Sequence, residues 1–377
     1  MSSTNGKPRS GKLSPPRRLA FSTGTGVLRI VASLVVPAIT FFALRWSFIF
    51  MRDADANKIL IAVVALVFGV GAVWALYLLT DNLVGLLPER ARRLIRPFVF
   101  VGPAMAILGI YLLYPTVQTL IQSFMGARGT EFVGLDNFAF VFTSPEMLIA
   151  LRNNLLWLVL VTGFVVSLGL IVAVMVDRIG RWEPVAKSII FLPMAISAVG
   201  AGVIWKFIYS FQAIQRPQIG LLNAILVALG GQPQGWLILK PWNNFFLIAI
   251  MIWILTGFAM VVLSAAVKSV PASLMEAARI DGASEIRIFF RIIIPYISGT
   301  LITISTTVII MVLKVFDIVY VMTNGQNNTE VIANRMYREL FTYRNQGHAS
   351  AIAIVLLIAV TPVMIYNIRS MRKGGVR

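Results

Sequence analysis

Eight apolar runs recur along the chain, and each is close to the length that a helix needs to cross a bilayer. A transmembrane helix requires about 20 predominantly apolar residues. Polar or charged segments separate the runs, which cover residues 27–50, 59–80, 97–121, 155–176, 188–209, 244–267, 296–320 and 348–368. Because 58% of the residues are hydrophobic and only 13% are charged, the sequence predicts an all-α polytopic membrane protein with about eight transmembrane helices.

The basic residues are distributed unevenly between the two sides of this topology. With a cytoplasmic N-terminus, 20 of the 33 Lys and Arg residues fall in the inner segments. This is the positive-inside bias, and it predicts that both termini lie in the cytoplasm. The bias also accounts for the net charge of +18 without a nucleic-acid partner.

Polar segments divide the chain into four parts. The first segment is rich in Pro, Ser, Lys and Arg and predicts disorder. We expect a disordered cytoplasmic tail at 1–26, an N-terminal extension with two transmembrane helices at 27–96, a core with six transmembrane helices at 97–370 that includes a charged loop at 269–295, and a cytoplasmic tail at 371–377.

The composition excludes several kinds of chemistry. The chain has no Cys and a single His, His348, so neither thiolate chemistry nor a multi-His metal site is possible. No G-x-x-x-x-G-K-[ST] loop occurs, so the chain cannot hydrolyse ATP by that route. We therefore expect no catalytic residue, metal site or cofactor in this chain, and we place His348 at the membrane interface.

The charged loop 269–295 lies between two apolar runs but cannot itself enter the bilayer. Each charged side chain would cost roughly 2.5–3.5 kcal/mol in the hydrocarbon. The loop carries Glu276, Arg279, Asp281, Glu285, Arg287 and Arg291. It is therefore expected to lie at a membrane surface between two anchoring helices.

Local residue preferences predict a helix–turn–helix within this loop. Pro271 suits a first helical position, and Ser273 offers a competing start with capping-box spacing. Gly282 allows a tight left-handed turn. A second helical piece is expected over 284–292, ended by Pro295, which also starts the next span.

The spacing within this loop resembles the signature of permease subunits of ATP-binding-cassette importers. Glu276-Ala277-Ala278 is followed after three residues by Gly282 and after nine more by Ile292-x-Ile294-Pro295, with Ile294 in place of the usual Leu. The resemblance implies a type I importer permease fold, here with two extra N-terminal spans. It also implies a coupling helix that docks on a separate ATPase subunit through Glu276, Ala277, Ala278, Arg279, Asp281 and Gly282.

Residues 313–338 and 132–138 resemble the carbohydrate branch of these permeases, of the maltose and α-glucoside type. Asn324-Gly325-Gln326-Asn327 departs from the Gly-Gly-Gly-Pro run that is usual in that branch. The resemblance implies a permease subunit that forms half of the translocation path of a carbohydrate importer in the bacterial cytoplasmic (inner) membrane. Its implied partners are a second permease subunit, two ATPase subunits that bind ATP and Mg, and an extracytoplasmic sugar-binding protein.

A sugar path requires hydrogen-bonding side chains and aromatic faces inside the helical bundle. The candidates are Asn154, Ser197, Trp205, Tyr209, Thr256, Ser305, Lys314 and Asp317. Lys314 and Asp317 are three residues apart and can meet on one helix face, where a neutralised structural pair is the alternative. Ser and Thr can instead bond backbone in their own or a neighbouring helix, and Trp205 and Tyr209 can be interfacial aromatics.

Two rival functions make different demands on the sequence. A self-contained secondary transporter or channel predicts inverted repeats and ion-coordinating acids within spans. No repeat is evident, and Asp317 is the only acid deep in a span. A membrane-embedded enzyme of glycosyltransferase type needs convergent carboxylates or a metal site, and the outer loops show no such spacing. The sequence therefore favours the interpretation that this chain is a permease subunit.

Overall fold

The computed structural model describes residues 39–52, 57–85, 88–213 and 215–374. The chain separates into two compact units, Met1–Tyr114 and Pro115–Arg377. The predicted tail 1–26, the first part of the run at 27–50 and the last residues of the tail 371–377 lie outside the described residues.

The described residues of the first unit form helices. A short apolar helix covers Ile39–Met51, α2 covers Lys58–Gly85, α3 covers Glu89–Leu108, and a π-helical turn, η1, covers Gly109–Leu113. Ring contacts connect these helices, with the Trp46 and Phe68 centroids 5.9 Å apart and those of Tyr77 and Phe100 5.5 Å apart. The two extra N-terminal spans are thus helical where described, while their crossing of the membrane stays a prediction.

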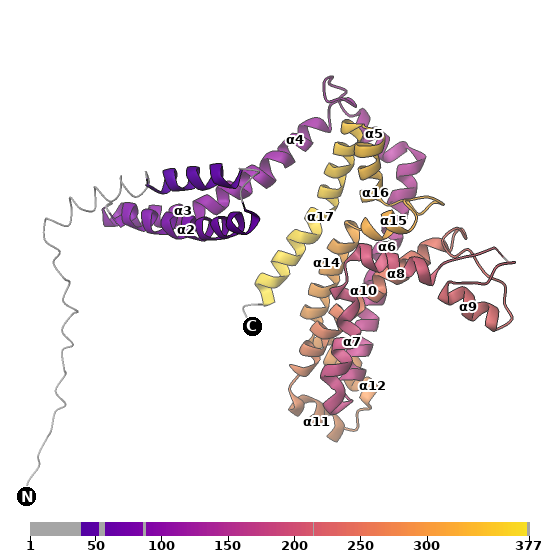
Figure 1. The fold of residues 1–377 in the computed structure, drawn as a ribbon. Helices are drawn as coiled ribbons and strands as arrows, with labels where there is room; N and C mark the ends of the chain where they lie inside the picture. The colour runs from indigo at the N-terminus through magenta and orange to yellow at the C-terminus, as the bar shows by residue number, and fades with distance from the viewer. Residues whose placement is uncertain (1–38, 53–56, 86–87, 214, 375–377) are drawn as a thin grey trace, which may run out of the picture. The chain divides into compact units, whose positions relative to one another are not determined.

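The second unit is also helical, and in its described residues the only strand-like pairing is an isolated bridge between Met125 and Phe132. Its elements are shown in Figure 1. They are α4 (Tyr114–Gln122), α5 (Asp136–Thr143), α6 (Pro145–Val176), η2 (Gly180–Trp182), α7 (Glu183–Ala195), α8 (Ala198–Ile208), α9 (Leu221–Ala228), α10 (Asn243–Lys268), α11 (Ala272–Ile280), α12 (Glu285–Ile288), η3 (Phe289–Ile293), α13 (Ile294–Tyr296), α14 (Ser298–Leu313), α15 (Asp317–Met322), α16 (Ile332–Tyr337), η4 (Arg338–Thr342) and α17 (Gln346–Gly374).

Four helices among the described residues are long and apolar enough to cross a membrane, and the number rises to six if two bent pairs each count as one span. The four are Glu89–Gln122, Pro145–Val176, Asn243–Lys268 and Gln346–Arg369. The all-helical membrane fold is confirmed, whereas the predicted count of eight spans is not.

The expected run at 188–209 is two helices, α7 and α8, that meet at 98°. Pro193 has no N–H to donate within α7, and the chain turns extended at Ile196 and Ser197, with ψ of 139° and 147°. The Ser197 hydroxyl then accepts a bond from the Gly200 N–H at 3.0 Å and starts α8. A single apolar run therefore contains a sharp corner.

The expected run at 296–320 is broken as well. The helical piece Glu285–Tyr296 meets α14 at 70°. Pro295 cannot bond to the carbonyl four residues earlier, and the preceding turn η3 is a wider π-helix. Contrary to the prediction, Pro295 lies within helical structure, and the corner comes at Ile297. Downstream, α14 ends at Leu313 and a separate helix, α15, begins at Asp317.

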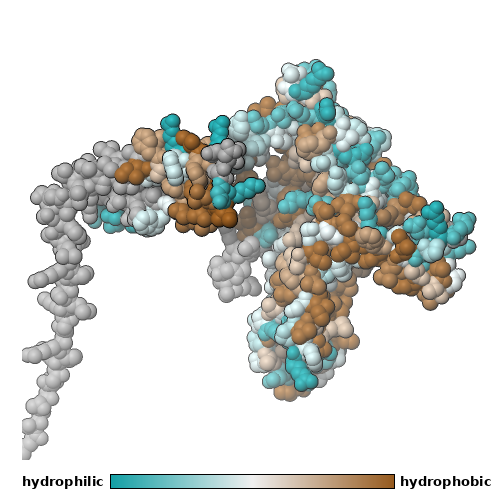
Figure 2. Space-filling view, viewed as in Figure 1, coloured by the Kyte–Doolittle hydropathy of each residue, from teal (hydrophilic) through white to brown (hydrophobic). Residues whose placement is uncertain are grey.

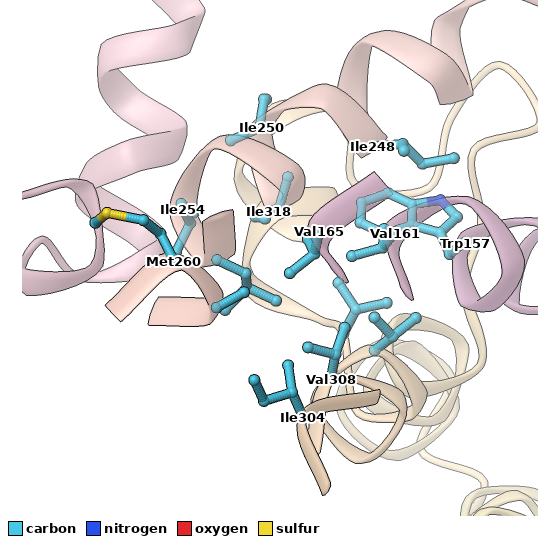
Figure 3. Close-up of a cluster of buried hydrophobic side chains, with 14 of the residues drawn as sticks. Trp157, Val161, Val165, Ile248, Ile250, Ile254, Met260, Ile304, Val308 and Ile318 are labelled. Carbon is cyan, nitrogen blue, oxygen red and sulfur yellow. The ribbon is translucent and has the colours of Figure 1, made fainter. Parts of the chain in front are cut away.

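The core of the second unit forms where α6, α10 and α14 meet. Trp157, Val161 and Val165 of α6 are fully buried in one cluster with side chains of α10 and with Val308 of α14 (Figure 3). Close approach of α10 to α7 is possible because Gly257 has no side chain, since a Cβ there would lie 2.7 Å from the Phe191 Cα. The shared cluster holds α10 and α14, which lie on either side of the charged loop, in the same core.

Apolar side chains cover much of the middle of the visible side of the second unit, and hydrophilic ones gather at the end that carries α11 and at the opposite end, near α5 and α16 (Figure 2). Large residues such as Ile189 and Leu192 of α7 are 65% and 61% exposed. So much exposed apolar area is unfavourable in water, and contact with lipid would cover it.

Candidate functional site

The charged loop folds as a helix–turn–helix at one end of the bundle. Helix α11 begins after Pro271 and ends at Ile280. Gly282 has a left-handed φ of 77°, its N–H donates to the Arg279 carbonyl at 3.0 Å, and the Ala283 N–H donates to the Ala278 carbonyl at 2.9 Å. This pair of bonds is a Schellman motif, so the predicted left-handed turn at Gly282 is confirmed.

Two side chains brace the turn. Ser284 caps α12 by accepting from the Arg287 N–H at 3.4 Å, and the Arg279 Nε lies 2.7 Å from Glu285 Oε1. The hydrogen bond that Arg279 donates to the Glu285 carboxylate raises the pKa of Arg279. Both partners are more than half exposed, so solvent screens the pair and the turn depends mainly on its backbone hydrogen bonds.

Helix α11 presents almost its whole surface to the outside. Within α11 only Met275 packs against the main core, and Glu276 and Ala277 are exposed. Apolar side chains are exposed as well: Leu274 is 46% exposed, Ile286 of α12 73% and Ile280 87%. A short helix that combines charge, a small residue and unburied aliphatic groups can dock into a groove of another protein.

One detail of the predicted loop differs in the structure. Pro271 precedes the first helical residue and serves as the N-cap, where the expectation placed it inside the first turn. Its ψ of 129° is extended, and therefore the helix begins one residue later.

Among the candidates for the solute path, Asn154 is held inside a structural network. Its side chain is 3% exposed, and its Oδ1 accepts from the Ile332 N–H at 2.8 Å. The neighbouring Asn153 donates to the carbonyls of Asn328 and Glu330, at 2.7 and 2.8 Å. These asparagines fasten the loop after α15 to the start of α6.

A second pair of asparagines performs the same task from α10. Asn243 donates to the Asn327 carbonyl at 2.7 Å, and Asn244 donates to the Asn328 carbonyl at 3.2 Å. The sequence analysis did not select this pair. The sequence does contain a signal for this pair. An Asn-Asn dipeptide occurs near the start of two apolar runs, and such side chains can donate to loop carbonyls near a helix start.

Trp205 and Tyr209 are brought together, with ring centroids 5.1 Å apart. Trp205 also meets Trp253 of α10 edge to face at 5.7 Å, and the Tyr209 hydroxyl donates to the Phe246 carbonyl at 3.0 Å. Tyr209 is only 4% exposed. These rings join α8 to α10, and the alternative that they lie in an interfacial belt does not fit the burial of Tyr209.

The hydroxyl candidates belong to three different elements, α8, α10 and α14. Ser197 caps α8, Thr256 donates to the carbonyl of Ile252 in its own helix at 2.7 Å, and Ser305 is half-buried in the middle of α14. The bonds of Ser197 and Thr256 are the local backbone interactions that the sequence allowed as an alternative.

Lys314 and Asp317 do not share a helix face, so the expected pairing is wrong in its geometry. Lys314 follows the last residue of α14, and Asp317 is the first residue of α15. Both are exposed, and among the ion pairs of the described residues none joins them. The helix break at 314–316 removes the three-residue spacing on which the prediction relied.

Buried charges gather after α15, at residues that the sequence analysis treated as loop. Glu330 Oε2 lies 2.8 Å from Arg338 Nη1, and Glu339 Oε1 lies 2.6 Å from Arg335 Nη2. Burial alone would raise the pKa of Glu339, but hydrogen bonds and charges from His348 and Arg335 outweigh it and lower the pKa. His348 belongs to this cluster because its Nδ1 lies 3.2 Å from Glu339 Oε2, and its ring also stacks on Phe140 with centroids 3.7 Å apart.

Residues 166–370 match the family described as the inner membrane component of binding-protein-dependent transport systems. This chain belongs to that family. The match runs from within α6 to within α17 and therefore includes α11 and its turn.

Two relatives resemble this permease over most of their lengths. The osmoprotective compounds uptake permease protein GgtC of Synechocystis sp. is 60% identical over 271 residues, which cover 72% of this chain and 97% of the relative. The alpha-glucoside transport system permease protein AglF of Rhizobium meliloti is 48% identical over 329 residues, covering 83% of this chain and 97% of the relative.

A solved structure supports the fold. A chain of a bacterial alginate ABC transporter, crystallised with an alginate pentasaccharide-bound periplasmic protein, matches with a TM-score of 0.65 and 22% identity, over 76% of this chain and 98% of that chain. The predicted type I importer permease fold is thereby confirmed. The permease is a multi-pass inner membrane transport subunit, not an enzyme, and works in systems that use a binding protein and a separate ATPase.

Proposed function

We propose that this permease imports a carbohydrate, of oligosaccharide or α-glucoside type, and forms half of the translocation path. The relatives named for α-glucosides, arabinooligosaccharides and lactose support this class of cargo. The relative named for osmoprotective compounds adds small polar osmolytes to the set that a test must include.

The exposed helix α11 is the observation that carries the coupling role. Glu276, Ala277, Ala278, Arg279, Asp281 and Gly282 are the residues assigned to contact a cytoplasmic ATPase subunit. Ala277 permits close approach of a partner backbone, and exposed Ile280 supplies apolar area that only a docking partner would bury. ATP and Mg bind to that partner.

The cargo path lies along α8, α10, α14 and α15 in this proposal. Trp205 and Trp253 offer indole faces, Ser305 a hydroxyl, and Lys314 and Asp317 exposed charges near the corner between α14 and α15. Asn154, Ser197, Tyr209 and Thr256 act by holding backbone in place, as their hydrogen bonds indicate.

The assembly consists of this chain, a second permease, two ATPase subunits and an extracytoplasmic sugar-binding protein. Both termini and α11 are cytoplasmic, and the loop fastened by the asparagines faces the binding protein. The excess of Lys and Arg in the segments on the α11 side supports this orientation.

Purification followed by transport tests the proposal. The permease is expressed with its genomic neighbours, purified by a tag on this chain, and reconstituted in proteoliposomes. We expect an ATPase to copurify and ATP to drive uptake of at least one labelled sugar from a panel of mono- and disaccharides, α-glucosides and uncharged osmolytes. Uptake by the lone chain without an ATPase would contradict the proposal.

A further inference from the structure

Four charged side chains and one hydroxyl connect the ends of α6, α7 and α10. We call Asp177, Glu183, Lys187, Ser264 and Lys268 the helix-end network. Lys187 Nζ lies 2.9 Å from Asp177 Oδ1 and 2.7 Å from Glu183 Oε1. The Ser264 hydroxyl donates to Asp177 Oδ1 at 2.6 Å, and Lys268 pairs with Glu183.

The helix-end network is balanced in charge and largely withdrawn from solvent. It holds two carboxylates and two ammonium groups, and the side chains of Asp177, Glu183 and Lys187 are only 14–20% exposed. Loss of Asp177, Glu183 or Lys187 would leave a partner uncompensated where solvent access is low, which is unfavourable. The Lys268 side chain is 51% exposed, so its loss should cost the fold less. The three helix ends therefore stay together.

This network stands next to the start of the coupling loop. Lys268 is the last residue of α10, and only three residues separate it from α11. Val270 between them is 4% exposed, so this connection is packed and can transmit a displacement. Through Glu183, the same lysine holds the first residue of α7.

Helix α7 continues this connection into the bundle. It leads from Glu183 to the corner at Ile196, after which α8 carries Trp205 and Tyr209. Contacts through Gly257 keep α7 against α10 along the way. A displacement of α11 can thus reach α8 through two connections, the packing of α7 on α10 at Gly257 and the bonds between the start of α7 and the end of α10.

We propose that the helix-end network is the mechanical tie that makes α7 follow α11, and that Lys268, Glu183, Lys187 and Asp177 are positioning residues for transport. The inference rests on the proposed coupling of α11 to an ATPase. In this proposal these residues raise the amount of sugar transported per ATP hydrolysed, in addition to stabilising the fold.

The test removes one charge of the tie in the full reconstituted complex. Lys268→Met breaks the pairs with Glu183 and Asp177, and Lys268→Arg keeps the charge. Arg181→Met is the matched control, because Arg181 lies between Asp177 and Glu183 in sequence and contacts the Trp182 ring instead. We expect Lys268→Met to lower sugar transported per ATP hydrolysed by about fivefold or more, the usual lower range of site-to-site coupling. Lys268→Arg and Arg181→Met should retain the parent ratio.

A distance measurement distinguishes loss of the connection between α7 and α11 from general destabilisation of the variant. The chain has no native Cys, so spin labels at Ala272→Cys in α11 and exposed Val185→Cys in α7 report one distance. When nucleotide is trapped on the ATPase, the distance should stay constant in the parent complex and change in Lys268→Met.

Each outcome decides the matter. A parent-like transport ratio in Lys268→Met, even with less folded complex, would overturn the tie and leave a structural ion pair. So would a label distance that stays constant in that variant while ATP is hydrolysed. A parent complex without any ATPase would overturn the proposed function, and this inference with it.

Discussion

Gly282 determines the shape of the turn between α11 and α12. Its φ of 77° is a conformation that costs a residue with a Cβ about 1–2 kcal/mol, and more for a β-branched one. A Cβ at this position would meet no atom within 4 Å, so the penalty is purely conformational. We expect Gly282→Val to insert normally and to lower uptake about 5- to 30-fold, measured in proteoliposomes.

Two controls isolate the cause of this loss. Gly282→Asn should retain most uptake, because Asn tolerates the left-handed region. Gly134→Val imposes the same backbone strain at φ 61°, also with open space around its Cβ, but far from α11 in sequence. Normal uptake by Gly282→Val would show that the turn does not contribute to coupling.

Asn153 is the residue on which the loop after α15 depends most. Its amide bonds two loop carbonyls, and Asn153→Ala leaves both without that donor, at about 1–3 kcal/mol. We expect faster amide hydrogen exchange over 323–331 in the variant. Thr361→Val, which removes only a bond to the carbonyl of Leu357 in its own helix, should leave the exchange there unchanged. Equal exchange in both variants would rule out this fastening role.

Sequence reasoning at the residue scale succeeded where the chemistry is local. The left-handed turn at Gly282 follows from one residue and its neighbours, and the structure has it. The Lys314–Asp317 pairing failed because it assumed a helix that continues past Leu313. The asparagine bonds could not be foreseen because they join residues at least 84 positions apart.

At the scale of elements, the packing of α7 on α10 depends on the absence of a side chain at Gly257. Gly257→Ala would place its Cβ 2.7 Å from the Phe191 Cα, and a backbone cannot yield as a side chain can. We expect about 1–3 kcal/mol of destabilisation and a lower thermal midpoint in detergent. Gly163→Ala on α6, where a Cβ meets no atom within 4 Å, is the matched control and should be neutral or slightly stabilising. A midpoint shared by both variants would contradict this close approach.

The order and type of the elements could be foreseen, but not the corners within them. Apolar length identified the region of 188–209, yet hydropathy averages over a window and does not register two extended residues at Ile196 and Ser197. Pro193 followed by a good N-cap was the available signal. For the same reason hydropathy did not predict the corner at Ile297. Pro295 indicated that the helix would bend in this region but not at which residue.

At the scale of the whole molecule, the orientation in the membrane is open to direct measurement. The absence of Cys means that single cysteines report without background. Arg287→Cys beside α11 and Gln326→Cys in the loop after α15 are both at exposed positions. We expect an impermeant maleimide to label Gln326→Cys in intact cells and Arg287→Cys only after permeabilisation. The reverse pattern would place α11 out of reach of a cytoplasmic ATPase.

The N-terminal extension can be tested for its part in transport. The chain separates at Tyr114–Pro115 into two compact units, and GgtC matches 97% of its length to only 72% of this chain. A chain that lacks residues 2–87 keeps the candidate span Glu89–Gln122 whole and retains every residue assigned to coupling or to the path. Because the variant keeps the second compact unit and one whole candidate span before it, we expect it to insert and to transport within about twofold of the full chain. Loss of insertion would make the extension necessary for assembly. Normal insertion with lost uptake would instead give residues 2–87 a direct role in the transport cycle, which the present assignment of the path to the second unit does not contain.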